Sequence, residues 1–288
     1  MTRRASVFLA GLQFGEGPRW HDGRLWFSDF YQHAVFAVSE DGKLERVVEV
    51  PQQPSGLGWL PDGCLLVVSM LDRRVLRREP DGALVEHADL SRLAPFHCND
   101  MAVDRAGRAY VGNFGFDLQA FRETGTPQPT PTVLIRVDPS GGASIAADDL
   151  HFPNGTVITP DGRTLIIAET FAYRLTAFDV ASDGMLSNRR VFADLQPLGV
   201  WPDGICLDAE GAVWVGNPAA AEVVRVAEGG KLLERVSTTQ PSFACMLGGV
   251  DRRTLFVLTA PDSGRDRKRE RKGAIEIAPV DVPGAGLP

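Results

Sequence analysis

The chain has 288 residues and a formal net charge of -7, with four cysteines and no long apolar run. The acidic balance argues against a nucleic-acid-binding protein, and the lack of a long apolar run argues against a membrane helix. The first residues lack the apolar core of a secretory signal, and the cysteines are scattered singly. We therefore expect reduced, mostly buried thiols in a cytoplasmic protein.

Short apolar runs bounded by Asp-Gly dipeptides follow one another from the first residues onward. In the first unit we expect strands near residues 16–20, 24–29, 34–38 and 43–49. Asp22-Gly23 and Asp41-Gly42 lie between these runs, and Asp-Gly readily supplies the positive φ of hairpin turns. No sustained helical period interrupts this pattern of strands and turns.

Five units of the chain begin with a polar residue in one common register. These head residues are Glu16, Ser55, Asn99, Asn154 and Asp203. They recur at intervals of roughly 40 to 55 residues, the period expected of propeller repeats. Further units are expected at 54–90, 98–149, 153–195 and 202–239, with a sixth from about residue 243. The repeat predicts an all-β, six-bladed β-propeller with four-stranded blades, formed as a single domain over residues 1–288.

The sixth unit lacks an obvious fourth strand. The run Ser6-Val7-Phe8-Leu9-Ala10 precedes the first unit and has no partner there. We predict that this N-terminal strand completes the sixth blade and closes the ring, which leaves only short protected edges.

Two insertions break the period, and the sequence assigns a role to neither. Residues 117–131 are interpreted as a proline-rich loop. Residues 262–273 contain the basic run Arg265–Lys272, which could touch nucleic acid or acidic lipid. We interpret it as a solvated loop, because the chain as a whole is acidic.

The common register brings the head residues together, because the first strand of each propeller blade lines the central channel. Two carboxylates and two amide oxygens on one axis form a site for a hard cation such as Ca²⁺, Mg²⁺ or Mn²⁺. The five histidines share no spacing, which weakens a zinc site. Ser55 is interpreted as a small residue that fills the channel, and Ala244 or Cys245 is expected at the sixth position.

The ends of the second strands return to the same mouth of the channel. We expect there a second polar ring that supports the metal site, formed by Asp29, Ser69, Asn113, Glu169 and Asn217. Asn113 and Asn217 could instead cap strand ends. Nearby apolar residues would wall a small-molecule pocket or form core between blades: Met70, Phe114, Phe116, Phe171, Trp201 and Phe243.

Several motifs in this register resemble the gluconolactonase, regucalcin and luciferin-regenerating enzyme family. They are Gly15-Glu16-Gly17-Pro18-Arg19-Trp20, Cys98-Asn99-Asp100, Phe152-Pro153-Asn154-Gly155, Trp201-Pro202-Asp203-Gly204 and Cys245-Met246-Leu247-Gly248-Gly249. The resemblance implies a six-bladed propeller with one divalent cation on its axis and a lactonase-type hydrolase acting on a carboxylic ester bond. It also implies that Glu16, Asn154 and Asp203 bind the metal, that Asp203 is the catalytic base, and that Asn99 contacts the substrate or a metal-bound water.

One position departs from the pattern of family members that act on sugar lactones. Those members often carry an arginine two residues before the asparagine, where this chain has His97. The expected activity is gluconolactonase-like, and this departure opens the alternative of a less polar lactone or ester. The residues expected to bind the substrate are Asn99, His97, Phe114, Phe171 and Trp201. Asp203 would take a proton from the attacking water while the cation polarises the lactone carbonyl.

The expected partners are few. They are a small-molecule lactone and one divalent cation, Ca²⁺, with Mg²⁺, Mn²⁺ or Zn²⁺ as alternatives. Neither nucleic acid nor membrane is expected to bind, and the protein is expected to be a monomer or a weak oligomer. The alternative functions are a calcium-binding propeller without catalysis and a platform for protein interaction.

Overall fold

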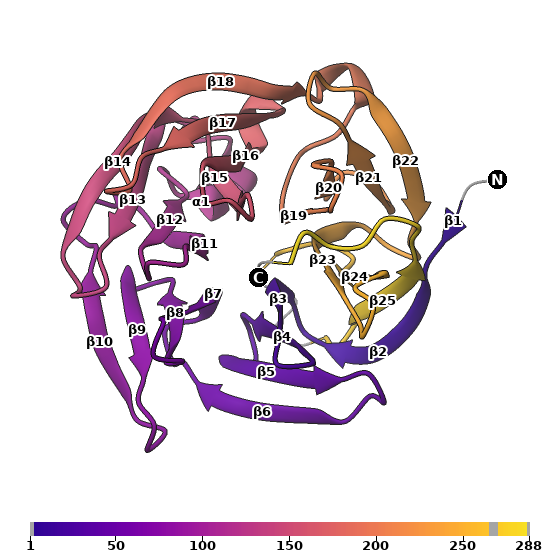
Figure 1. The fold of residues 1–288 in the computed structure, drawn as a ribbon, viewed down its shortest axis with the longest axis horizontal. Helices are drawn as coiled ribbons and strands as arrows, with labels where there is room; N and C mark the ends of the chain where they lie inside the picture. The colour runs from indigo at the N-terminus through magenta and orange to yellow at the C-terminus, as the bar shows by residue number, and fades with distance from the viewer. Residues whose placement is uncertain (1–2, 265–269, 287–288) are drawn as a thin grey trace.

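The described residues form a ring of six antiparallel sheets around a central axis (Figure 1). The structure is a computed structural model, and it describes residues 3–264 and 270–286. Each sheet has a core of four antiparallel strands, with its first strand nearest the axis. The fold is therefore the predicted six-bladed β-propeller.

The first three blades are built from consecutive strands. Blade 1 contains β3 (Gly15–His21), β4 (Arg24–Asp29), β5 (Ala34–Ser39) and β6 (Leu44–Glu49). Blade 2 contains β7 (Pro54–Trp59), β8 (Leu65–Ser69), β9 (Arg74–Arg78) and β10 (Leu84–Asp89). Blade 3 contains β11 (Cys98–Val103), β12 (Ala109–Asn113), β13 (Thr132–Val137) and β14 (Ala143–Leu150). These bounds lie within a residue or two of the predicted ones.

The remaining blades complete the ring. Blade 4 contains β15 (Pro153–Ile158), β16 (Thr164–Glu169), β17 (Arg174–Val180) and β18 (Leu186–Asp194), with a short 3₁₀ helix, η1 (Thr170–Ala172). A second 3₁₀ helix, η2 (Gln196–Leu198), leads to blade 5. Blade 5 contains β19 (Ile205–Leu207), β20 (Val213–Gly216), β21 (Glu222–Val226) and β22 (Leu232–Ser237). Blade 6 contains β23 (Ser242–Gly248), β24 (Thr254–Thr259) and β25 (Gly273–Pro279).

The N-terminal segment closes the ring, as predicted. Strand β2 (Ser6–Leu12) pairs antiparallel with β25 and supplies the fourth strand of blade 6. The two-residue strand β1 (Arg3–Arg4) pairs parallel with β22 of blade 5, a contact that the sequence did not predict. The N-terminal chain thereby joins two neighbouring blades.

Apolar side chains fill the spaces between neighbouring blades. Between blades 6 and 1, the rings of Trp20 and Phe256 stack with centroids 5.5 Å apart, and Phe8 of β2 meets Phe256 edge-on. Each sheet buries both faces in this way, which accounts for the nearly continuous Val, Ile and Leu runs. All four cysteines are buried and free, as predicted.

The glycine that follows most head residues permits the inner strands to approach one another. A Cβ atom on Gly155 would lie 2.5 Å from the backbone nitrogen of Ile205, and one on Gly204 would lie 2.5 Å from the Cβ of Ala244. Any side chain at these positions would therefore push neighbouring blades apart. The close approach holds the head residues around a narrow axis.

The insertion at 117–131 contains a helix where a loop was expected. Helix α1 (Leu118–Thr124) begins after Asp117, whose side chain accepts a hydrogen bond from the amide of Ala120, and ends at Gly125 in the left-handed conformation. With seven residues it is too short to produce a helical period in the sequence. No helix among the described residues combines the length and apolar character needed to cross a membrane.

Candidate active site

The head residues gather at one mouth of the channel. Glu16, Ser55, Asn99 and Asn154 are each the second residue of the first strand of their blade. Asp203 lies two residues before β19, and two backbone hydrogen bonds of 3.2 Å hold it in place. Its carbonyl accepts from the amide of Gly155, and its amide donates to the carbonyl of Gly216. The common register seen in the sequence therefore becomes a common position in space.

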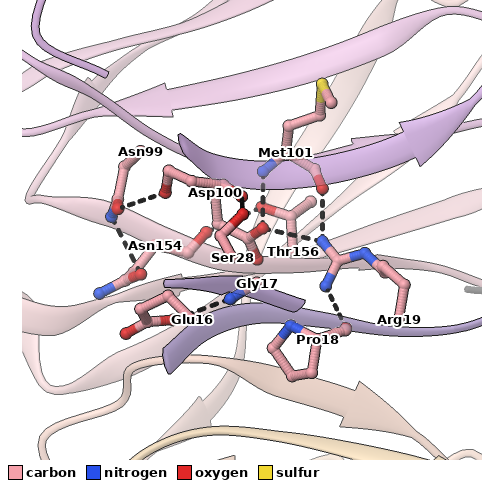
Figure 2. Close-up of polar contacts among 11 residues, drawn as sticks. Glu16, Gly17, Pro18, Arg19, Ser28, Asn99, Asp100, Met101, Asn154 and Thr156 are labelled. Carbon is pink, nitrogen blue, oxygen red and sulfur yellow. Dashed lines mark hydrogen bonds and ion pairs between the residues drawn. The ribbon is translucent and has the colours of Figure 1, made fainter. Parts of the chain in front are cut away.

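Hydrogen bonds connect these side chains across the blades (Figure 2). Asn99 Nδ2 donates to Asn154 Oδ1 at 3.0 Å, and Ser55 Oγ donates to Asn99 Oδ1 at 3.5 Å. Asn154 Nδ2 donates in turn to Thr170 Oγ1 at 3.2 Å, and that hydroxyl donates to the carbonyl of Pro202 at 2.7 Å. Ser55 thus takes part in this network of hydrogen bonds.

Two carboxyl groups are buried in this network. The side chains of Glu16 and Asp203 belong to residues that are each 8% exposed. Burial is the main reason that the pKa of Asp203 is raised to about 8. A hydrogen bond from Asn154 lowers this pKa, and the negative charge of Asp100 raises it further. Burial, followed by the charges of Asp203 and Asp100, raises the pKa of Glu16 well above its ordinary value.

A buried ion pair lies directly behind this pair of acids. Arg19 Nη2 lies 2.8 Å from Asp100 Oδ1 and also donates to the carbonyl of Met101 (Figure 2). Arg19 Nη1 donates to the carbonyl of Pro18 at 2.8 Å. Asp100 is therefore already paired with an arginine, whereas Glu16 and Asp203 are the acids that a cation could bind.

The donor set fits a hard divalent cation. Among the described residues, neither Glu16 nor Asp203 forms an ion pair with a lysine or arginine, although both are buried. Asn154 Oδ1 accepts one hydrogen bond and keeps a second lone pair. Two carboxylates and an amide oxygen are ligands preferred by Ca²⁺ and Mg²⁺, and a cation would compensate the burial of two like charges. The described residues contain no cluster of three His, Cys, Asp or Glu side chains, so any such site depends on the asparagines.

A cavity of about 720 Å³ lies above the two acids. All of the predicted substrate-binding residues line it: Asn99, His97, Phe114, Phe171 and Trp201. His97 packs against Phe96, with ring centroids 4.0 Å apart, and meets Phe114 edge-on at 6.0 Å. The imidazole is thus part of an aromatic wall.

Several wall residues were not predicted from the sequence. The rings of Phe114 and Phe152 stack at 4.7 Å, Phe152 meets Phe171 at 5.3 Å, and Tyr173 meets Trp201 at 4.7 Å. Phe152 has a φ of 59°, an uncommon value for a bulky residue. Its place directly before Pro153-Asn154 was a signal in the sequence that could have identified it. Other unpredicted lining residues include Phe14, Phe30, Tyr31, Phe96, Phe121 and Thr170.

In the described part of the chain, the predicted second polar ring forms no side-chain hydrogen bond with Glu16, Asn154 or Asp203. Asp29 accepts hydrogen bonds from the backbone amides of Gln13 and Phe14, at 2.8 and 3.2 Å. Glu169 accepts from the amide of His151 at 2.8 Å and pairs with Arg174 at 2.8 Å. The other three members likewise bond to groups near their own strand ends: Ser69, Asn113 and Asn217. These residues brace the loops at the mouth, because strand ends there leave backbone groups to satisfy.

The sixth position of the ring also differs from expectation. Phe243 lines the cavity, whereas Ala244 and Cys245 do not. The Cys245 thiol lies instead 3.5 Å from the carbonyl oxygen of Trp214, within the core between blades 5 and 6. The polar ring is therefore interrupted by an aromatic side chain on blade 6.

Both insertions contribute to the cavity. Helix α1 and the residues around it supply Leu118, Phe121, Arg122 and Gln128, and the blade 6 loop supplies Ser263. Most of the basic run predicted as a solvated loop, Arg265–Arg269, lies outside the described residues.

Comparison with known proteins agrees with this geometry. Residues 14–261 match the profile of the family described as the SMP-30/Gluconolactonase/LRE-like region. Regucalcin of Danio rerio is 30% identical over 261 residues, which cover 86% of this chain and 83% of the relative. A 6-deoxy-6-sulfogluconolactonase of Pseudomonas putida is 25% identical, with 95% and 94% of the two chains covered. A solved structure of a calcium-binding protein, regucalcin, from Agrobacterium tumefaciens superposes with a TM-score of 0.82 at 21% identity, covering 100% of this chain and 98% of the other.

The chain belongs to the SMP-30/gluconolactonase/LRE-like family. Relatives in this family, such as the sulfogluconolactonase, are lactonases. The family resemblance seen in the sequence motifs is thus confirmed.

Proposed function

We propose that the protein is a metal-dependent hydrolase that opens a lactone of low polarity to its hydroxy acid. The observation that carries this proposal is the position of two buried acids, Glu16 and Asp203, at the floor of an aromatic-walled cavity of about 720 Å³. A cavity of this size holds a small organic molecule. The lactonase among the relatives supports the same class of reaction.

The proposed cofactor is one divalent cation, bound by Glu16, Asn154 and Asp203. Ca²⁺ is favoured by the all-oxygen donor set, and by the Agrobacterium neighbour, which is described as calcium-binding. Mg²⁺, Mn²⁺ and Zn²⁺ are the alternatives. When bound, such a cation would supply a positive charge that polarises the ester carbonyl.

The side chains of this protein would perform the remaining steps. Asp203 accepts a proton from water, whose oxygen forms a bond to the lactone carbonyl carbon. The bond between that carbon and the ring oxygen then breaks, and Asp203 returns the proton to the leaving oxygen, which becomes the hydroxyl of the product. Asn99 orients the substrate at the floor of the cavity, and the aromatic wall binds its apolar part.

The character of the wall argues against a heavily hydroxylated substrate. His97 offers fewer hydrogen-bond donors than arginine and no fixed positive charge. Its ring also packs against Phe96 and Phe114. Sugar hydroxyls placed against these aromatic rings would lose water without gaining equivalent partners, which costs free energy. A monomer or weak oligomer in the cytoplasm remains our prediction for the protein as a whole.

A screen of lactones graded by polarity tests the proposal. The protein is first freed of metal with a chelator and then assayed with added Ca²⁺, Mg²⁺, Mn²⁺ or Zn²⁺. We expect no turnover without metal and a higher kcat/KM for alkyl or aryl lactones than for gluconolactone. Full activity of the metal-free protein would contradict the metal role, and a preference for gluconolactone would contradict the proposed pocket. Tight calcium binding without turnover of any lactone would instead indicate a non-catalytic calcium-binding protein.

A further inference from the structure

A single arginine stands among the described residues that line the cavity. Arg122 of α1 is the only lysine or arginine in that lining, within a chain whose formal net charge is -7. In the described part of the chain its guanidinium forms no ion pair with a carboxylate, and Nη2 donates to Ser263 Oγ at 2.8 Å. A guanidinium has five donors, so this bond leaves most of them available.

The position of Arg122 is fixed by its surroundings. Phe121, the residue before it, meets the rings of Phe116 and Phe171 at 5.8 and 6.1 Å, which anchors α1 against the aromatic wall. On the other side, Ser263 accepts from Arg122 through its hydroxyl and from the Tyr31 hydroxyl through its backbone carbonyl, at 3.0 Å. Segments of blades 1, 3 and 6 thus meet around the guanidinium.

Arg122 and the two acids line the same cavity but differ in burial. Glu16 and Asp203 are each 8% exposed and lie at the floor, whereas Arg122 is exposed and lies at the mouth. The aromatic wall belongs to the same cavity. A carboxylate on a substrate can form charge-assisted hydrogen bonds with the remaining donors of the Arg122 guanidinium. Because the ester must lie near Asp203 to react, a carboxylate at the other end of such a molecule would lie near Arg122.

We propose that Arg122 is a specificity-determining residue and that the substrate is an apolar lactone carrying a carboxylate at the end away from the scissile ester. This inference rests on the proposed lactonase function and adds the substrate class. The ester lies at the floor near Asp203, the apolar body lies along the wall, and the carboxylate binds Arg122. Helix α1, which belongs to the insertion in blade 3, supplies the residue that selects the substrate.

The first test measures binding without catalysis. The probes are a δ-valerolactam with a carboxyalkyl chain on its ring, which resists hydrolysis, and the primary amide of the same compound. Titration calorimetry compares the calcium-loaded wild type with Arg122→Gln and Arg122→Lys. We expect Arg122→Gln to weaken binding of the carboxylate, relative to the amide, by roughly 10- to 100-fold, because a hydrogen bond to a charged group is worth about 1.5–3 kcal/mol. Arg122→Lys keeps the charge and should retain part of the preference.

A matched control separates a local effect from the general loss of charge. Arg105 is an exposed arginine at the opposite end of β11 and β12 from the cavity. Arg105→Gln should leave the ratio of the two affinities within about twofold of wild type, because exposed distant charges are screened. An equal loss of affinity for carboxylate and amide in Arg122→Gln would overturn the proposal, since it would indicate that Arg122 only holds the loops together.

The second test uses the matching lactone and its methyl ester as substrates. We expect the ratio of kcat/KM for the acid to that for the ester to fall in Arg122→Gln, mainly through KM. If neither compound is hydrolysed but the lactams bind with the expected preference, the lactonase proposal fails while the role of Arg122 in anion binding stands. If both are hydrolysed and the ratio is unchanged, the lactonase proposal stands and the role of Arg122 fails.

Discussion

At the residue scale, the proposed mechanism gives Asp203 two roles. As a metal ligand it supplies an oxygen and a negative charge, and as a base it accepts a proton. Burial of the Asp203 carboxyl and the hydrogen bond that it accepts from Asn154 affect both roles, because they determine how readily this carboxyl ionises. Glu16 has a comparable burial but would serve only as a ligand. Substitutions that preserve shape can separate these roles.

Asp203→Asn is expected to keep measurable but weaker metal affinity, because the amide oxygen remains. Its kcat should fall by roughly 100- to 10,000-fold, the usual contribution of a positioned general base, or about 3–5 kcal/mol of barrier. Glu16→Gln should mainly weaken metal binding, with activity recovering at high metal concentration. The measurement is kcat at saturating metal, with occupancy checked by calorimetry. A fully occupied Asp203→Asn with near-native kcat would show that Asp203 is only a ligand.

The raised pKa of Asp203 makes metal affinity depend on pH. With a pKa of about 8, this carboxyl is largely protonated at neutral pH in the metal-free protein, and a cation must displace the proton. Affinity should therefore rise with pH, by up to tenfold per unit for each proton displaced, and level off above the pKa. Calcium titrations from about pH 6 to pH 9, in buffers of different ionisation enthalpy, measure both affinity and proton release. A constant affinity with no proton release would contradict this expectation.

At the element scale, strand β2 determines whether the ring is closed. It supplies the fourth strand of blade 6 and packs Phe8 and Leu9 against the core that blades 6 and 1 share. Without it, β25 would present an unpaired edge, which is a site for aggregation. Helix α1 is as important for the cavity as β2 is for the ring, because it places residues of the insertion at 117–131 in the cavity wall.

Deletion of residues 1–11 should destabilise all six blades together. Loss of the β2 pairing and of the partly buried side chains of Phe8 and Leu9 removes apolar burial, for which about 1.5–3 kcal/mol for each large side chain is the upper limit reached at full burial. Calorimetry should show one transition at a lower melting temperature. Val7→Ala is the matched control in the same strand, because Val7 is 52% exposed and its truncation should change little. An unchanged melting temperature after the deletion would mean that β2 is dispensable.

At the scale of the whole molecule, the site joins separate blades. Glu16 belongs to blade 1, Asn99 to blade 3 and Asn154 to blade 4, and Asp203 directly precedes blade 5. A ligand held by several of them would tie together parts of the ring that are distant in sequence. Binding at the axis should therefore stabilise the entire fold.

Calcium is expected to raise the free energy of unfolding by about 2.7 kcal/mol at a concentration 100 times its Kd, because it binds the folded state alone. At the same calcium concentration, Glu16→Gln should show a smaller gain. Glu40→Gln is the control, since it removes an exposed carboxylate of the same blade. Denaturant unfolding with and without calcium provides the measurement. Equal stabilisation of all three proteins would show that calcium acts elsewhere.

Much of the architecture was determined by local sequence. Alternation of side chains along a strand and positive φ at Asp-Gly turns are properties of a few neighbouring residues. The repeat could therefore predict the blades, the closure by β2 and the ring that holds Glu16, Asn99, Asn154 and Asp203. These features recur in each unit, so each unit supported the interpretation of the others.

The tertiary structure alone decided what surrounds that ring. The hydrogen bonds of Asp29 and Glu169 to nearby backbone groups, the place of Phe243 at the sixth position and the wall residue Phe152 depend on how loops cross the mouth. The contact of Arg122 with Ser263 joins residues 141 positions apart in sequence. Loops have no repeating pattern, and their conformation follows from the contacts they find after the blades have packed. The sequence thus determined the floor of the cavity, while its wall and mouth were decided by packing between distant segments.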